Sequence, residues 1–185
     1  MIDKINEDQE RFWFKSLLCK ENGISAEIDD KIQDEDYIVL KIDKYYASLK
    51  MAETPPSPDC LIIVKCKKNN LYDLYLVELK NIKSPAGFKV NNIKAKFKTA
   101  VKDFMCERFK DILLNKSYSI NKFKIYFVTD ACRIKKYHPD ITEEDYLKRI
   151  ETTKLKRVQN LKPLKFRNKS AAIDSRLPNP MIKYC

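Results

Sequence analysis

The stretch "SPDCLIIVKCKKNNLYDLYLVELKNIKS", residues 57–84, decides the fold of this chain. It contains two apolar segments, residues 60–67 and 71–78, and the short polar sequence KNN separates them. Two apolar runs around such a turn predict an antiparallel β-hairpin. The sequence therefore predicts two neighbouring buried strands, and the other elements are placed relative to them.

Charged residues lie at the open end of this hairpin. Asp59 begins the first strand and Glu78 ends the second, so antiparallel pairing brings them opposite each other. Lys80 has the same parity as Glu78 and faces the same side of the sheet. Two adjacent carboxylates repel unless a proton or a cation lies between them, and their hard oxygens favour Mg²⁺ or Mn²⁺. With a lysine to orient a water molecule, this pattern predicts a site for metal-assisted hydrolysis.

The surrounding sequence predicts a mixed sheet flanked by helices. In chain order it predicts a helix over residues 3–20 ending at Gly23, a strand over 37–42, the hairpin, a helix over about 90–114, a strand over 123–129 and a helix capped by Thr142. The helix over 90–114 has an apolar face made of Ile93, Phe97, Ala100, Val101, Phe104 and Ile112. This order predicts an α/β fold.

Composition bounds the class of protein. With 185 residues, of which 44% are hydrophobic, the chain is long enough for one domain with a sizeable core. No apolar run approaches the roughly 18 residues of a membrane span, and the polar first ten residues do not resemble a signal peptide, so we expect a cytoplasmic protein. Two glycines are too few for a glycine-rich phosphate loop.

Cysteine and histidine offer little further chemistry. The six cysteines form no CxxC pair, so we expect free thiols in a reducing compartment, without zinc or disulfides. The single histidine, His138, lacks an evident partner, and we expect it in a turn. We expect Trp13 and Phe14 in the core rather than stacked on bases.

Charge is distributed unevenly along the chain. Residues 1–59 contain 8 Lys/Arg and 14 Asp/Glu, whereas residues 60–185 contain 29 and 12. A basic field of this strength attracts polyanions by releasing their counter-ions. A solvated lysine-rich surface explains the charge equally well, so charge alone does not decide for nucleic acid.

The sequence Pro58-Asp59 followed by Glu78-Leu79-Lys80 resembles the PD-(D/E)xK nuclease superfamily, the restriction-endonuclease-like fold. The resemblance covers about residues 1–130 and implies an αβββαβ core, with the PD acid on the second strand and ExK on the third. It implies that Asp59, Glu78 and the carbonyl of Leu79 coordinate Mg²⁺, for which Mn²⁺ substitutes. It also implies that Lys80 positions the attacking water. Within this chain, Pro139-Asp140 is the other PD pair, and no [DE]xK follows it.

Many members of this superfamily add a third acid from the first helix, and here the alternatives stay open. Glu10 shares a helical stripe with Phe14 and Leu17, which makes it the first candidate metal ligand. Glu7 lies on the same face, and Glu53 precedes Asp59 by six residues. The edge of an ordinary amphipathic helix explains Glu10 equally well.

Basic residues after the hairpin are candidate phosphate contacts. Those nearest the predicted site or recurring along the long helix are Lys83, Lys89, Lys94, Lys98 and Lys102. Residues 152–185 are basic, poor in periodicity and interrupted by prolines. We therefore expect a catalytic domain over residues 1–151 and a basic C-terminal extension over 152–185, either an arm that contacts DNA or a disordered end.

These observations predict a Mg²⁺-dependent endodeoxyribonuclease, most similar to a small type II restriction endonuclease. Such an enzyme implies DNA as partner, a homodimer and a cognate methyltransferase. A Holliday-junction resolvase or repair nuclease of the same superfamily is the alternative enzyme. A non-catalytic nucleic-acid-binding module is the alternative outside catalysis, although it predicts a damaged catalytic position and all three residues are intact.

Overall fold

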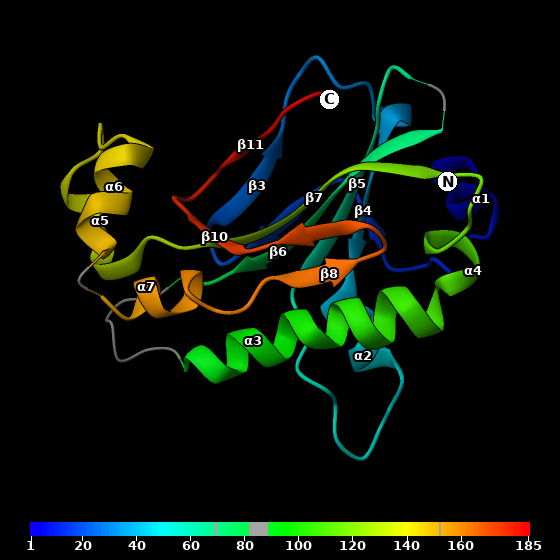
Figure 1. The fold of residues 1–185 in the computed structure, drawn as a ribbon, viewed down its shortest axis with the longest axis horizontal. Helices are drawn as coiled ribbons and strands as arrows, with labels where there is room; N and C mark the ends of the chain where they lie inside the picture. The colour runs from blue at the N-terminus through cyan, green and yellow to red at the C-terminus, as the bar shows by residue number, and fades with distance from the viewer. Residues whose placement is uncertain (69, 82–88, 152) are drawn as a thin grey trace.

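A computed structural model describes residues 1–68, 70–81, 89–151 and 153–185, and it is built around one six-stranded mixed sheet (Figure 1). The strands of this sheet, in spatial order, are β1 (Lys15–Ser16), β4 (Tyr37–Lys41), β5 (Cys60–Lys65), β6 (Leu71–Leu79), β7 (Ser119–Val128) and β10 (Ile173–Arg176). Neighbours from β1 to β6 are antiparallel, whereas β6, β7 and β10 run parallel.

The predicted hairpin forms the centre of the sheet. Strands β5 and β6 pair antiparallel, with Cys60 opposite Val77 and Lys65 opposite Tyr72. Most of their side chains are buried on both faces of the sheet, which explains why the two segments are apolar along nearly their whole length. The predicted strands over residues 37–42 and 123–129 are confirmed as β4 and β7.

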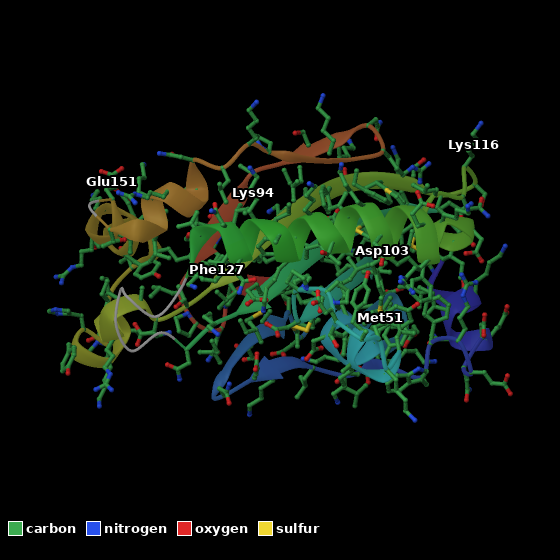
Figure 2. All side chains as sticks on the ribbon, turned by 90° about the horizontal axis from the view of Figure 1, so that it is seen from below. Met51, Lys94, Asp103, Lys116, Phe127 and Glu151 are labelled. Carbon is green, nitrogen blue, oxygen red and sulfur yellow. A yellow bond between two sulfur atoms is a disulfide. The ribbon has the colours of Figure 1, made fainter. Side chains whose placement is uncertain are left out.

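Helices cover one face of the sheet. They are α1 (Ile2–Glu7), α2 (Ile42–Ser48), α3 (Val90–Thr99), α4 (Lys110–Leu113), α5 (Ile134–Tyr137), α6 (Glu143–Ile150) and α7 (Lys154–Gln159), with short 3-10 turns η1 (Asp34–Asp36) and η4 (Ala131–Arg133). A π-helical segment, η3 (Ala100–Arg108), joins α3 to α4, and the three form one rod across the sheet (Figure 2). This rod confirms the helix predicted over 90–114, and its six predicted apolar residues are buried. Thr142 caps α6 as predicted, because its side chain accepts a hydrogen bond from the backbone N–H of Asp145.

A second, smaller sheet covers the opposite face. It consists of β2 (Cys19–Glu21), β3 (Ile24–Ile28) and β11 (Met181–Ile182) in the order β11-β3-β2. Its buried side chains pack against those of β5, β6 and β7 in a second hydrophobic core. The sheet is therefore flanked by helices on one side and by strands on the other. A further hairpin, β8 (Leu164–Phe166) with β9 (Lys169–Ala171), lies beside the helical layer.

The helix predicted over residues 3–20 is wrong beyond Glu7. The chain leaves α1 and forms β1 and then β2, and Gly23 belongs to the β2–β3 turn rather than to a helix end. Asn22 and Gly23 have φ values of 46° and 82°, so Asn-Gly makes the tight turn for which it is the strongest short signal. Trp13, predicted in the core, is 53% exposed, whereas Phe14 is buried as predicted.

The C-terminal region is folded rather than a disordered end. Strand β10 extends the main sheet, with Ile173 opposite Ile125, and β11 extends the small sheet beside β3. The strands of this region, from two to four residues long, are too short to produce a clear period in the sequence, which explains why the sequence analysis missed them. The division at residue 151 stays a prediction.

Four cysteines are bonded in pairs, so the expectation of free thiols is wrong for them. Cys19 is joined to Cys60 and Cys66 to Cys185, with Cα–Cα distances of 6.0 and 5.2 Å. The partners are 41 and 119 residues apart in sequence, so only the tertiary structure brings them together. Within the described residues, no helix has the length and apolar character needed to cross a membrane.

Candidate functional site

Asp59 and Glu78 face each other across the central hairpin. The last printed pair of the register, Cys60 with Val77, puts Asp59 opposite Glu78, one step farther along the strands. Side chains in opposed positions have Cβ atoms about 5 Å apart. Asp59 is two residues from Leu61, and Glu78 is two residues from Leu76, so each acid shares a face of the sheet with its leucine. Both leucines belong to the core on the helical face, so both carboxylates point toward α3. The predicted convergence of the two acids is confirmed.

Both carboxylates are buried. Asp59 is 5% and Glu78 is 2% exposed. Asp59 Oδ2 accepts a hydrogen bond from the backbone N–H of Leu79 at 2.5 Å, which ties the PD aspartate to the ExK segment. Leu79 thus touches the site through its backbone, although the observed group is its N–H and not the carbonyl that the resemblance implied.

Burial changes the acidity of both groups. Loss of solvent, followed by the charge of Glu78, raises the pKa of Asp59 to about 8, despite the opposing hydrogen bond from Leu79. Burial also raises the pKa of Glu78, and the charge of Lys96 opposes that rise. A pair of acids with raised pKa values stabilises bound protons or a bound cation.

Lys96 is the residue at this site that the sequence analysis missed. Its Nζ lies 2.6 Å from Glu78 Oε1, and the side chains are 23% and 3% exposed. Lys96 follows Ile93 by three residues and precedes Ala100 by four, so it lies at the edge of the buried helical face. That spacing was the available signal, but the regular stripe of Lys94, Lys98 and Lys102 obscured it.

One oxygen of the site has no hydrogen-bond partner among the residues that the structure describes. Glu78 Oε2 is buried and accepts no hydrogen bond from the described residues. An unsatisfied buried carboxylate oxygen is costly, and a divalent cation is one ligand that would satisfy it. The donor set, two buried carboxylates with hard oxygens, fits Mg²⁺ or Mn²⁺.

Lys80 lies beside the pair but makes a different contribution from Lys96. Its side chain is exposed, and its backbone N–H donates to the carbonyl of Val128 at 2.9 Å. Its charge lowers the pKa of Glu78 less than the charge of Lys96 does. The structure therefore brings all three predicted catalytic residues together, with Lys80 at the solvent side.

A third acid, Glu21, approaches the site from the small sheet. The Cys19–Cys60 disulfide joins the strand of Glu21 to the residue after Asp59. Asn81 Nδ2 donates to the carbonyl of Asn22 at 3.2 Å, so the β2–β3 turn is also tied to the end of β6. The charge of Glu21 raises the pKa values of both Asp59 and Glu78. Sequence analysis missed Glu21 because it placed this residue just after a helix.

Of the three acids proposed as a third ligand, Glu7 and Glu10 lie away from the site. Helix α1, with Glu7, lies at the other end of the hairpin, where the N-terminal amine donates to Tyr72 at 3.0 Å. Glu10 is exposed, and the next residue, Arg11, pairs with Asp111 at 2.6 Å. Asp111 is 15 residues beyond Lys96 on the helical rod, or about 20 Å. The helical stripe on which the Glu10 prediction depended does not form.

The remaining predicted contacts are at the surface. Glu53 is exposed in the loop before β5. Lys89 is the residue that precedes α3, and it is exposed, as are Lys94, Lys98 and Lys102. Lys83 lies outside the described residues. These exposed lysines follow the rod from the residue before α3 to Lys102 in η3, and Figure 2 shows Lys94 near the beginning of α3.

A second group of metal-ligating atoms lies at the turn end of the hairpin. The ligand atoms of Cys66, Asp73 and Cys185 lie within 4.8 Å of one another. The two sulfurs are bonded to each other, and Asp73 accepts hydrogen bonds from Asn121 and from the backbone of Lys122. Because the sulfurs are bonded to each other and the carboxylate already accepts hydrogen bonds, this group is a disulfide cross-link beside a satisfied carboxylate and not a metal site.

Comparison of the chain with protein-family models, with curated proteins and with solved structures found no match.

Proposed function

We propose that this protein is a Mg²⁺-dependent endonuclease that hydrolyses DNA phosphodiester bonds and belongs to the restriction-endonuclease-like fold. The observation that carries the proposal is the buried pair Asp59 and Glu78, with an oxygen of Glu78 that no described donor satisfies. A pair of this kind is unstable as two bare charges and is suited to a divalent cation.

The topology supports the same proposal. Strands β4, β5 and β6 are antiparallel, the rod beginning with α3 connects β6 to β7, and β7 runs parallel to β6. Asp59 precedes the second of these strands, and Glu78 is the penultimate residue of the third. These are the positions that the resemblance to the PD-(D/E)xK superfamily implies, although α2 is inserted between β4 and β5.

Each group of residues at the candidate site has a separate role in the proposed hydrolysis. Asp59 and Glu78, with the carbonyl of Leu79, would hold Mg²⁺, which when bound supplies Lewis-acid activation of the phosphate and of the attacking water. Asp59 is kept in place by the N–H of Leu79. Lys80, exposed beside the acids, stabilises the negative charge that develops on the phosphate. The lysines of α3 hold the DNA backbone without reading its sequence.

Cleavage of DNA by variants of the two acids tests the proposal. Purified protein is incubated with supercoiled plasmid and with phage DNA in Mg²⁺, Mn²⁺ or Ca²⁺. We expect cleavage in Mg²⁺ and Mn²⁺, and a loss of about hundredfold or more in Asp59→Asn and in Glu78→Gln, because each removes a charged ligand. Glu144→Gln is the matched control, since Glu144 is exposed on α6 and pairs with Lys148 rather than with either acid of the site.

The pattern of products separates the alternatives. Discrete fragments indicate a type II restriction endonuclease, for which we also propose a homodimer that cuts both strands. Nicking or cutting confined to branched DNA indicates a resolvase or a repair nuclease. If every DNA stays intact and salt-sensitive binding is the same in both variants, the protein is a binding module and the proposed reaction is refuted.

A further inference from the structure

We propose that Lys96 is the internal counter-ion of the candidate metal site: its ammonium holds Glu78 in the metal-free protein, and a divalent cation must displace it to bind. This inference rests on the proposed function, and it adds to it a lysine that the ExK pattern does not contain. It assigns to Lys96 a positioning role, since the displaced ammonium is delivered to the side on which the substrate phosphate binds.

The contact itself is the first support. Nζ of Lys96 is 2.6 Å from Glu78 Oε1, and the glutamate side chain is only 3% exposed. An ammonium this close to a desolvated carboxylate occupies the space on that side of the group that a cation would use. Glu78 Oε2 has no donor among the described residues, so Lys96 satisfies only half of the carboxylate.

The two lysines near the pair are not equivalent. Lys80 is exposed, and within the described residues its side chain makes no hydrogen bond or ion pair with an acid. Lys96 is partly buried and its backbone is fixed, because Ile93 and Phe97 on either side of it are buried in the core. A fixed backbone with a flexible four-carbon stem lets the ammonium move by a few ångströms while α3 stays in place.

When a cation displaces the Lys96 ammonium from Glu78, a phosphate of the bound substrate is the group that receives it. Lys89, the exposed residue that precedes α3, is seven residues or about two turns before Lys96 and so lies on the same side of the helix, and Lys80 is exposed beside Glu78. A phosphate held by these two lysines lies near the end of the Lys96 side chain. Leaving Glu78, the ammonium exchanges a carboxylate partner for a phosphate partner, both of which accept charged hydrogen bonds. Lys96 thereby links occupation of the metal site to binding of the DNA backbone.

Metal affinity in the absence of DNA is the decisive measurement. Mn²⁺ is titrated calorimetrically into the metal-free protein and into Lys96→Met, Lys96→Arg, Lys80→Met and Lys94→Met. We expect Lys96→Met to bind Mn²⁺ about tenfold more tightly or better, since a competing charge at contact distance is removed. Lys96→Arg, which keeps the charge, and Lys94→Met, the matched surface control, should stay within about twofold of the wild type.

The rate of DNA cleavage is the second measurement, and Lys96→Met should lower this rate although it raises the affinity for the metal. At saturating Mg²⁺ we expect Lys96→Met to cut DNA about tenfold more slowly despite its tighter metal binding, because its phosphate contact is lost. A purely structural role for Lys96 would weaken metal binding and cleavage together. Circular dichroism and the melting temperature of Lys96→Met and of the double variant with Glu78→Gln show whether each variant is folded.

The outcomes separate this inference from the proposed function. If Mn²⁺ binding depends on Asp59 and Glu78 but Lys96→Met binds no more tightly than the wild type, the inference is overturned and the proposed metal site stands. If neither the wild type nor Lys96→Met binds Mn²⁺, or if the wild type, Asp59→Asn and Glu78→Gln bind it equally, both fail. Tighter binding confined to Lys96→Met, with slower cleavage, establishes the counter-ion.

Discussion

At the scale of single residues, the fold buries the two acids of the candidate site side by side, although burial and mutual repulsion both disfavour their charged forms. Asp59 is 5% exposed and faces Glu78, which is 2% exposed. Burial, and then the charge of Glu78, raises the pKa of Asp59 to about 8, far above its value in an unfolded chain. The folded protein therefore binds more protons than the unfolded chain between about pH 4 and pH 8.

This difference predicts how the metal-free protein responds to pH. By linkage, the contribution of Asp59 to the free energy of unfolding is fully present below its unfolded pKa and is lost as pH rises through about 8. Asp59→Asn removes the ionisable group but keeps an oxygen for the N–H of Leu79. In EDTA at pH 8 we expect this variant to be about 1–3 kcal/mol more stable than the wild type, with little gain at pH 5. Urea unfolding at the two pH values measures the effect.

Asp111 is the control for this measurement because its shift has the opposite sign. The hydrogen bond from Arg11 holds the pKa of Asp111 below its usual value. Asp111→Asn should therefore lose stability at pH 8 and lose less in acid, because the stability that the lowered pKa gives the wild type is lost as pH falls below the unfolded pKa of about 4. An equal effect of pH on both variants would show that the buried pair is not the source.

Sequence patterns could identify the acids but not their partners. The position of Asp59 opposite Glu78 follows from strand parity and from a short turn that fixes the register of the hairpin. Both are local properties of the sequence. Lys96 and Glu21 reach the site through packing of α3 and through a hairpin tied by the Cys19–Cys60 disulfide. Contacts of that kind depend on where elements meet in space, so spacing along the chain does not reveal them.

At the scale of elements, the rod that carries Lys96 is anchored at a different point by a buried tyrosine. Tyr46 of α2 is fully buried, and its hydroxyl donates to Asp103 Oδ2 at 2.5 Å. Arg108 Nε donates to the same oxygen at 2.6 Å. Asp103 and Arg108 both belong to the π-helical segment η3, and Figure 2 shows Asp103 toward the α4 end of the rod.

Removing the Tyr46 hydroxyl should loosen this anchor. Tyr46→Phe keeps the ring in the core but removes one of the two donors to Asp103, so we expect a loss of about 1–2 kcal/mol in the free energy of unfolding. Tyr45→Phe is the matched control, because Tyr45 accepts only a 3.4 Å hydrogen bond from Arg108. Equal losses in the two variants, measured by urea unfolding, would contradict the assigned anchor.

The elements that sequence analysis predicted correctly are those with a strong local period. The hairpin, β4, β7 and the rod each bury a regular set of side chains, and all four were predicted. The segment after Glu7 failed because Phe12 and Phe14 are buried alternately, with the period of a strand, while Leu17 and Leu18 suggested a helix. A segment too short to show a clear helical or strand period adopts the secondary structure that its tertiary contacts favour.

At the scale of the whole molecule, the C-terminal region completes both sheets and the helical core. β10 covers the edge of β7, and β11 pairs with β3. The buried side chains of this region that enter the main core include Leu155, Val158, Phe166 and Ile173. The basic charge of residues 152–185, which suggested an arm for DNA, therefore lies on a segment that also stabilises the fold.

Truncation separates these two roles. A chain ending at residue 151 loses β10 and the buried residues of α7 and β8, which leaves the edge of β7 and a large apolar area exposed. Burying one large apolar side chain stabilises by about 1.5–3 kcal/mol, so losing four costs about 6–12 kcal/mol, which is comparable to the whole stability of a typical domain, about 5–15 kcal/mol. We expect the truncated chain to show no cooperative thermal transition and to aggregate, as followed by circular dichroism and light scattering.

A shorter deletion gives the control. Removing residues 183–185 takes away Tyr184 and the Cys66–Cys185 disulfide but leaves β10 and β11 in place, so a cooperative transition at a lower temperature is expected. If the chain ending at residue 151 instead unfolds cooperatively, residues 1–151 are an independent domain and the extension is an arm. In that case its 34-residue deletion should weaken salt-sensitive DNA binding while leaving Mn²⁺ binding unchanged, because Asp59 and Glu78, the two acids of the proposed metal site, lie within residues 1–151.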